Sequence, residues 1–156
     1  MINEQYFRFP RRLLDSPTLR VLTINERRAL DRILSEHQSK SGYVNDGLPV
    51  TSKDFECAGV HPRRLTQSLR VLVALGIIEC TRSMTGSSSG RRPNLWRPTF
   101  LPRTPKTNDA THDYLKIKTV AEAKKIAAVH RIPETRSGPP SPKRRKRLVS
   151  IAECAS

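Results

Sequence analysis

The chain contains few cysteines, few aromatic residues and no long apolar run. Its three cysteines are too few and too widely spaced for a disulfide scaffold. Aromatic residues make up only 5% of the chain and hydrophobic residues 36%, so we expect part of the chain to lie outside a packed core. No apolar run is long enough for a transmembrane helix, and the N-terminus lacks the apolar stretch of a signal peptide. These absences predict a cytoplasmic protein with no membrane partner.

Acidic residues are also scarce. The chain has 29 Lys and Arg residues against 14 Asp and Glu residues, which gives a formal net charge of +15 at pH 7. Residues 1–102 contain 16 basic and 9 acidic residues, and residues 103–156 contain 13 and 5, so the positive charge is not confined to one end. An excess of this size favours a polyanionic partner, with nucleic acid ahead of an anionic membrane.

The common motifs of enzymes are absent. The chain has no nucleophile elbow, no P-loop, no zinc-protease helix and no dinucleotide fingerprint. Cys57 and His61 are four residues apart, but a structural zinc site normally needs four ligands. Cys57 and Cys80 sit among apolar residues and are expected to pack as small hydrophobic side chains. His37 is expected to stabilise a helix C-terminus rather than act as a base. We therefore expect no catalysis, no metal and no cofactor.

The strongest helical pattern runs from Arg63 to Leu75. Its apolar residues recur with the i, i+4, i+7, i+8 spacing of a packed helix face: Leu65, Leu69, Leu72 and Val73. At roughly 100° per residue, the opposite face carries Arg63, Gln67, Arg70 and Ala74, with Arg64 at its edge. No acidic residue lies between Val60 and Ile78. One face of this helix is expected to pack, and the other to present hydrogen-bond donors.

The residues before this helix predict a shorter helix and a sharp turn. Thr51 stands three residues ahead of Asp54, which is an N-cap pattern for a helix over about Ser52–Cys57. Gly59 permits a positive φ and therefore a tight connection. Pro62 suits the first turn of the following helix, where no backbone donor is needed. Two helices joined by a short glycine-containing turn form a helix-turn-helix.

A β-hairpin is predicted after the second helix. Residues 77–81 form its first strand, and residues 95–100 return. The connecting loop, residues 86–92, is rich in Gly and Ser and ends in Arg91 and Arg92. A hairpin with a basic tip directly after the second helix is the wing of a winged helix.

The residues that make up this pattern read LPVTSKDFECAGVHPRRLTQSLRVLVALGIIECTR and RRPNLWRPTF. This stretch resembles the winged-helix branch of the helix-turn-helix superfamily, and in particular small bacterial helix-turn-helix proteins of plasmids and integrative elements. The resemblance extends over about Tyr6 to Pro102. It implies a nucleic-acid-binding domain that is mainly α with a small β-hairpin, and it leaves the biological role open.

The other segments are predicted to surround this domain. Thr23 and Glu26 have the spacing of a capping box, which predicts a helix that runs to about Gln38. Residues 39–49 contain the turn residues of a loop, and residues 103–113 have the composition of a linker.

The C-terminal third is predicted to hold a helix and a disordered basic tail. The helix covers residues 114–131, and its weak apolar stripe leaves two interpretations open. It docks on the domain or pairs with a second copy, or it is a basic arm that contacts DNA. Residues 132–156 are rich in proline and contain five consecutive cations, which repel one another and seek phosphate: Lys143, Arg144, Arg145, Lys146 and Arg147.

The sequence thus predicts a winged helix-turn-helix domain over residues 6–102, followed by the linker, the C-terminal helix and the tail. As base-reading residues we expect Arg63, Arg64 and Gln67, because Arg pairs with guanine and Gln with adenine in the major groove. Phosphate contacts are expected from Thr51, Arg70, Arg91, Arg92, Lys143, Arg144, Arg145, Lys146 and Arg147.

The expected function is sequence-specific binding of double-stranded DNA by a nucleoid-associated transcriptional regulator. A replication, partition or transfer accessory protein of a mobile element is the alternative with the same fold. An RNA-binding module is disfavoured because the chain lacks surface aromatic residues arranged for base stacking. A protein–protein adaptor is disfavoured by the arginine pairs at the helix start and in the wing. A homodimer is left open.

Overall fold

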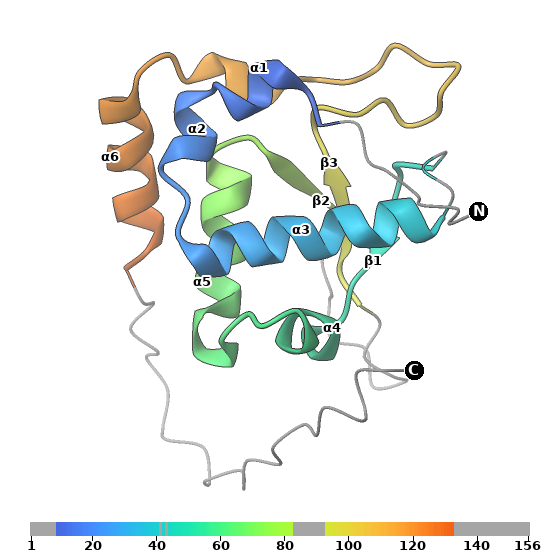
Figure 1. Ribbon diagram of the computed structural model, residues 1–156, viewed down its shortest axis with the longest axis horizontal. Coiled ribbons are helices and arrows are strands. Elements are labelled where there is room, and N and C mark those ends of the chain that lie inside the picture. Colours follow the sequence, from blue (N-terminus) through green and yellow to red (C-terminus); the bar gives the residue numbers. More distant parts are fainter. Residues whose placement is uncertain (1–8, 41, 43, 83–92, 133–156) are drawn as a thin grey trace, which may run out of the picture.

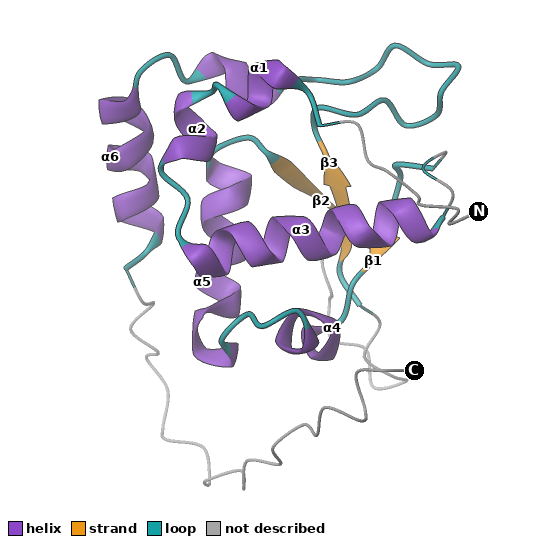
Figure 2. Cartoon of the chain, in the orientation of Figure 1, coloured by secondary structure: helices purple, strands orange, loops and turns teal. Residues whose placement is uncertain are grey.

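The computed structural model describes residues 9–40, 42, 44–82 and 93–132 (Figure 1). Helices dominate, and the strands form one small sheet (Figure 2). The helices are α1 (Arg11–Leu14), α2 (Pro17–Arg20), α3 (Ile24–Ser39), α4 (Ser52–Cys57), α5 (Pro62–Ala74), the short 3-10 helix η1 (Asp113–Lys116) and α6 (Val120–His130). The strands are β1 (Leu48–Pro49), β2 (Ile78–Arg82) and β3 (Leu95–Pro98). The prediction of a mainly α protein with a small β element is confirmed.

Part of the predicted site lies outside the described residues. This applies to Arg91 and Arg92 of the hairpin loop and to the cations Lys143–Arg147 of the tail. The helix-turn-helix segment and the residues predicted to read bases are described in full.

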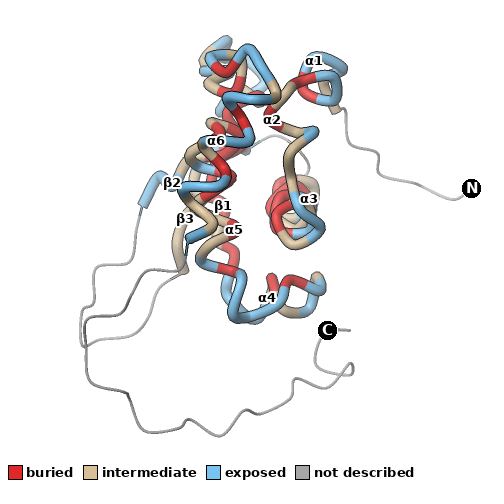
Figure 3. The backbone as a smooth tube through the Cα atoms, turned by 90° about the vertical axis from the view of Figure 1, so that its left-hand side faces the viewer, coloured by how far each residue is buried: buried red, intermediate tan, exposed pale blue. Residues whose placement is uncertain are grey.

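α3 is the central helix, and the predicted capping box closes its N-terminus. Thr23 Oγ1 accepts a hydrogen bond from the Glu26 N–H at 3.5 Å, and Glu26 Oε2 accepts one from the Thr23 N–H at 2.7 Å. α3 crosses in front of α5 and the sheet in Figure 1. Its buried side faces α5 in Figure 3, so the main core lies between these two helices and the sheet.

The sheet has the order β1-β3-β2, and both strand pairs are antiparallel. β2 and β3 are the predicted hairpin, in which Cys80 lies opposite Trp96. The loop predicted over residues 39–49 contains β1, and that prediction is wrong there because a two-residue strand is too short to show a period of its own. The central strand tolerates Pro98 because β1 pairs only with Leu95 and Trp96.

α5 packs with a different phase from the predicted one. Its buried residues are Leu65, Ser68, Val71 and Leu72. Leu69 is partly buried and packs against the core as predicted, but Val73 is 41% exposed, so the predicted packing of Val73 is wrong. Small Ser68 is 3% exposed, because a hydroxyl side chain fits a close helix contact while the bulkier neighbours turn outward. As a result, the outward face of α5 carries apolar side chains as well as polar ones.

The C-terminal helix starts later than predicted and packs on the rest of the molecule. Residues 113–116 form η1, and α6 begins at Val120 with the side chain of Thr119 as its N-cap. Tyr114, Ile117, Ala123 and Ala127 all belong to the same hydrophobic core as the residues of α3 and α5. Of the two interpretations that the sequence leaves open for this helix, the structure has the docked one, since α6 contacts α5 and α2.

Both described cysteines are at the surface. Cys57 is exposed at the end of α4, and Cys80 is exposed in the outer part of β2. The prediction that they pack as core residues is wrong, because the nearby apolar residues Phe55 and Ile78 point into the core while the cysteines do not.

Candidate nucleic-acid interface

The turn between α4 and α5 has a fixed geometry. Gly59 has φ +82°, the positive value that the sequence predicts for it. The side chains on either side of it, Phe55 and Val60, are 1% and 2% exposed and anchor the turn in the core. The Val60 N–H donates to the Phe55 carbonyl at 2.9 Å, which closes the end of α4.

Two side chains of α3 hold this turn from the other side. Arg28 Nη1 donates to the Gly59 carbonyl at 2.9 Å, and Asn25 Oδ1 accepts from the His61 N–H at 3.0 Å. These bonds join residues that are 31 and 36 positions apart, so no local sequence pattern could have revealed them. They fix the direction in which α5 leaves the turn.

α5 begins as the sequence predicts. Pro62 is its first residue, and His61 is its N-cap, with the imidazole Nδ1 accepting from the Arg63 N–H at 3.2 Å. Arg63 and Arg64 are exposed on the first turn. The first turn of α5 therefore presents two guanidinium groups next to the positive end of the helix dipole.

Gln67 lies half-buried one turn further and contacts Arg64. Arg64 Nη1 donates to Gln67 Oε1 at 3.0 Å. Gln67 Nε2 is buried and has no hydrogen-bond partner within the described part of the chain. The structure thus brings two of the three predicted base-reading residues into contact, and this contact occupies the Gln67 carbonyl.

Two cations of α3 have carboxylate partners. Arg27 pairs with Asp31 at 3.1 Å, and Arg32 pairs with Glu36 at 3.0 Å. Among the described residues, neither Arg63 nor Arg64 has a carboxylate within 4.0 Å. The charge at the start of α5 is consequently available to an external anion.

Thr51 is engaged in the cap of α4. Its Oγ1 donates to Asp54 Oδ2 at 2.6 Å, and its N–H donates to the same oxygen at 2.7 Å. Burial on its own would raise the pKa of Asp54, but the bonds from Thr51 and the charge of Arg32 outweigh it and hold the pKa below its ordinary value. Because the Thr51 hydroxyl donates its hydrogen bond to the Asp54 carboxylate, we leave Thr51 out of the set of phosphate contacts.

The structure adds exposed residues that the sequence pattern missed. Thr66 lies between Arg63 and Arg70 on the outward face of α5, Lys53 is in the first turn of α4, and Arg82 ends β2. Thr66 could be found only once the buried face of α5 was known. Lys53 and Arg82 could be found only from their exposure in the structure.

Arg97 of β3 is a buried cation rather than a surface one. It is 1% exposed, and its Nε lies 3.0 Å from Glu79 Oε1 on β2. This cross-strand pair ties the two strands of the hairpin together below the loop. Arg97 is therefore not available to a polyanion.

A groove lies along the outward face of α5, between the β2–β3 hairpin and α6, and we call it the α5 groove. It has a volume of about 680 Å³. Leu65, Leu69 and Val73 of α5 line it together with Trp96 of β3 and Ile126 of α6. Its polar lining includes Arg70 of α5 and His130 at the end of α6. Arg70, in the C-terminal half of α5, thus lies beside a cavity.

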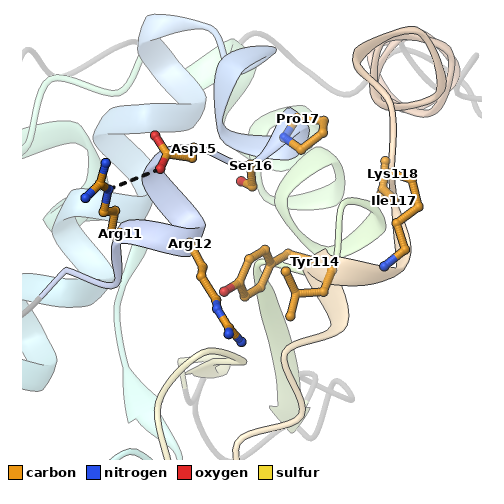
Figure 4. A pocket seen from close by; sticks show the side chains of 9 residues that line it. Arg11, Arg12, Asp15, Ser16, Pro17, Tyr114, Ile117 and Lys118 are labelled. Atoms are coloured by element: carbon orange, nitrogen blue, oxygen red, sulfur yellow. Dashed lines mark ion pairs between the residues drawn. The ribbon is translucent and has the colours of Figure 1, made fainter.

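A second cavity, of about 400 Å³, lies between α1, α2 and η1. Figure 4 shows Arg12 beside the ring of Tyr114, and Arg11 paired with Asp15 at 3.5 Å. Tyr114 is 1% exposed, and burial raises the pKa of its phenol. This cavity lies at the end of the molecule opposite α4 (Figures 1 and 3), so we assign it no part in the candidate interface.

Comparisons with protein-family models, with curated proteins and with solved structures found no match to this chain. Within the described ranges, no three His, Cys, Asp or Glu side chains are grouped so that they could hold a metal ion. No helix in the described part of the chain has both the length and the apolarity needed to cross a membrane.

Proposed function

We propose that this protein binds double-stranded DNA in a sequence-specific manner and regulates transcription, with α5 as the helix that enters the major groove. The observation that carries the proposal is the start of α5. It presents Arg63 and Arg64 without carboxylate partners in the described chain, on a helix whose direction is fixed by α3. An α-helix fits the width of the major groove, and its N-terminal residues reach the base edges in helix-turn-helix proteins.

In this proposal α4, the turn and α5 form the helix-turn-helix, and β2 and β3 form the wing. The order of the elements supports the assignment, since the hairpin follows α5 directly after Gly76. The ion pair of buried Arg97 with partly exposed Glu79 joins the two strands that lead to the loop carrying Arg91 and Arg92. In this proposal the wing loop contacts the phosphates beside the major groove.

The donors divide into two sets. Arg63, Arg64 and Gln67 are in the N-terminal half of α5 and read bases. Arg70 further along α5, Lys53 of α4 and Arg82 at the end of β2 contact phosphates. Reading adenine requires both polar atoms of the Gln67 amide, so the hydrogen bond between Arg64 and Gln67 opens when DNA binds.

The test is the binding of selected duplexes by single-residue variants. A preferred site is first selected from a random duplex pool with the full-length protein. Arg63→Ala and Gln67→Ala are expected to lose about 1–3 kcal/mol of discrimination between the selected site and a scrambled duplex. Arg20→Ala removes one exposed charge from α2 and should leave that discrimination unchanged. If both α5 variants discriminate as well as the wild type, α5 is not the base-reading helix.

A further inference from the structure

We propose that the second cavity, between α1, α2 and η1, binds a small organic carboxylate. The carboxylate group contacts Arg12 and the hydroxyl of Tyr114, and the apolar part of the ligand packs on Pro17, Leu115 and Ile117. This site is separate from the proposed DNA-binding face, because it lies at the end of the molecule opposite α4 (Figures 1 and 3). It therefore goes beyond the proposed function and does not depend on DNA binding.

The second cavity has the size and the apolar wall of a small-molecule site. Its volume of about 400 Å³ is within the range of pockets that hold small organic ligands. Pro17 of α2, Leu115 of η1 and Ile117 just after η1 supply apolar surface. Ile117 is 8% exposed and belongs to the hydrophobic core, so the packing of the fold holds this wall in place.

Tyr114 supplies a hydrogen-bond donor that the described part of the protein does not use. The residue is 1% exposed, and its hydroxyl has no hydrogen-bond partner among the described residues. Figure 4 shows this hydroxyl at the cavity, beside the side chain of Arg12. Burial raises the pKa of the phenol, and the charge of Arg12 opposes this only in part, so the hydroxyl keeps its proton at neutral pH. A ligand oxygen in the cavity therefore gains this hydrogen bond.

Two cations of the cavity have no counter-charge in the described chain. Arg12 extends from α1 on one side of the Tyr114 ring, and Lys118 lies on the other side in the view of Figure 4. Among the described residues, neither of the two side chains has an ion-pair or hydrogen-bond partner. Arg12 is next to the free hydroxyl, so a single carboxylate can accept hydrogen bonds from both groups.

The carboxylates around the cavity have other partners. Asp15, the one acidic residue among the described residues that line it, lies 3.5 Å from Arg11. Asp113 of η1 lies 2.6 Å from Lys116 Nζ, and Glu122 of α6 accepts from a backbone N–H at 3.2 Å. The charged residues of the lining are three cations and one carboxylate: Arg11, Arg12, Lys118 and Asp15. The excess of positive charge selects an anion, and the apolar wall selects an organic one.

An NMR titration of the full-length protein tests the site. Isotope-labelled chain is titrated with benzoate, and with benzamide as the neutral compound of the same shape, at constant ionic strength. We expect saturable shifts of the backbone amide signals of residues 115–118 with benzoate. Benzamide should bind at least about tenfold more weakly, because it lacks the charge that Arg12 recognises.

Three variants separate ligand contacts from structural roles. Tyr114→Phe removes only the hydroxyl. It should weaken benzoate about tenfold and leave the urea midpoint of unfolding unchanged, because that hydroxyl bonds no described residue. Arg12→Met should also weaken benzoate about tenfold. Arg20→Met is the matched control, since it removes the same charge from an exposed residue of α2 outside the cavity, and it should change binding less than about twofold.

Four results would each overturn the site. Equal affinity of benzoate for Arg12→Met and Arg20→Met would mean that the overall positive charge attracts the anion. Equal binding of benzamide and benzoate would mean that the cavity selects no anion. A lower urea midpoint of Tyr114→Phe would mean that the hydroxyl has a partner within the protein. Shifts confined to α5 would place benzoate in the α5 groove instead. Binding of benzoate by a chain that binds no duplex would support this site and refute only the DNA-binding proposal.

Discussion

Glycines with positive φ differ in what surrounds them. Gly42 and Gly76 have φ of +66° and +68°. A Cβ at Gly42 would meet its nearest atom, on His37, at 3.8 Å, whereas a Cβ at Gly76 would come within 2.8 Å of the Asp113 backbone. Both positions require a positive φ. Only at Gly76 must the side chain also be absent, because a Cβ there would collide with η1.

Substitution of these two glycines by alanine should therefore lower the free energy of unfolding by different amounts. Gly42→Ala should destabilise the fold by about 1–2 kcal/mol, the cost of the left-handed conformation for an L-residue. Gly76→Ala should cost more, about 3 kcal/mol or above, because η1 must also move. Urea unfolding of both variants against the wild type measures the difference. Equal costs would show that the approach of η1 to Gly76 contributes nothing to stability.

His37 gives stability a pH dependence. It is 5% exposed on α3, and burial lowers its pKa below the ordinary value of 6.5. Below pH 6.5 the unfolded chain therefore binds a proton that the folded chain resists, so this contribution to stability is complete above that pH and is lost as the pH falls towards the lowered folded-state pKa. His37→Gln should reduce the loss of stability between pH 7 and pH 5. Urea unfolding across that range checks this, and the interval from pH 7 to 8 is the internal control, where His37 should contribute no slope.

At the scale of residues, a side-chain hydrogen bond could be predicted where its partner is near in the sequence. The caps formed by Thr23 with Glu26 and by Thr51 with Asp54 follow from a three-residue spacing. The bonds from Arg28 to Gly59 and from Arg131 to Glu26 join residues 31 and 105 positions apart. They depend on how the helices pack, which no local pattern specifies.

At the scale of elements, the spacing of apolar and capping residues predicted where helices lie better than which face of a helix packs against the core. α5 begins at Pro62 as predicted, but its packed face is rotated, because Ser68 is buried and Val73 is not. A small polar residue can be buried at a close contact between helices, and an apolar residue can be exposed along a groove. Neither case follows the pattern in which apolar side chains face the core and polar ones face solvent. The α5 groove is the consequence of this rotation, so the sequence could not have revealed it.

Arg131, the C-cap residue of α6, forms an ion pair with the buried Glu26 of α3. Arg131 Nε and Nη2 donate to the two carboxylate oxygens of Glu26 at 2.8 and 2.7 Å, and Nη2 also donates to the Val21 carbonyl at 2.8 Å. The side chain of Glu26 is 3% exposed and that of Arg131 is 31% exposed. Removing one partner leaves a buried carboxylate without its counter-charge.

Arg131→Met should therefore cost about 2 kcal/mol, below the full effect of a completely buried pair because Arg131 reaches solvent. Arg11→Met is the matched control, since the ion pair of Arg11 with Asp15 has side chains that are 94% and 65% exposed. That variant should cost less than about 0.5 kcal/mol. Hydrogen exchange should show faster opening of the amides of α6 in Arg131→Met alone. Unchanged exchange in α6 would mean that its apolar contacts hold it without the ion pair.

At the scale of the whole molecule, the acidic residues neutralise the scaffold and leave the candidate interface basic. Within the described chain, the carboxylates of α3, β2 and the first turns of α4 and η1 pair with cations of the same or adjoining elements. α5 has no acidic residue. The net charge of +15 is therefore unevenly distributed, and such a distribution raises the rate and the salt dependence of association with a polyanion.

The last prediction concerns residues 133–156, which lie outside the described residues. A chain that ends at Ile132 keeps α6 and the pair of Arg131 with Glu26, so it should fold as the full chain does. The deleted segment contains Lys143–Arg147 and, by composition, is predicted to have no core of its own. Such cations contact phosphates without a fixed geometry and carry no sequence information. Truncation should therefore weaken binding equally on a selected site and on a scrambled duplex.

Salt dependence makes this prediction quantitative. For each phosphate that the truncated chain no longer neutralises, the slope of log affinity against log salt should fall by about 0.9 on duplex DNA. The weakening should be largest at low salt and fade near physiological ionic strength, where exposed charges are screened over roughly 8–10 Å. Salt titrations of full-length and truncated protein on both duplexes measure it, with urea unfolding as the control for folding. A reduction of affinity confined to the selected site would mean that the segment reads sequence. A truncated chain that unfolds would mean that residues beyond Ile132 belong to the core, and either result would refute the role assigned to the segment.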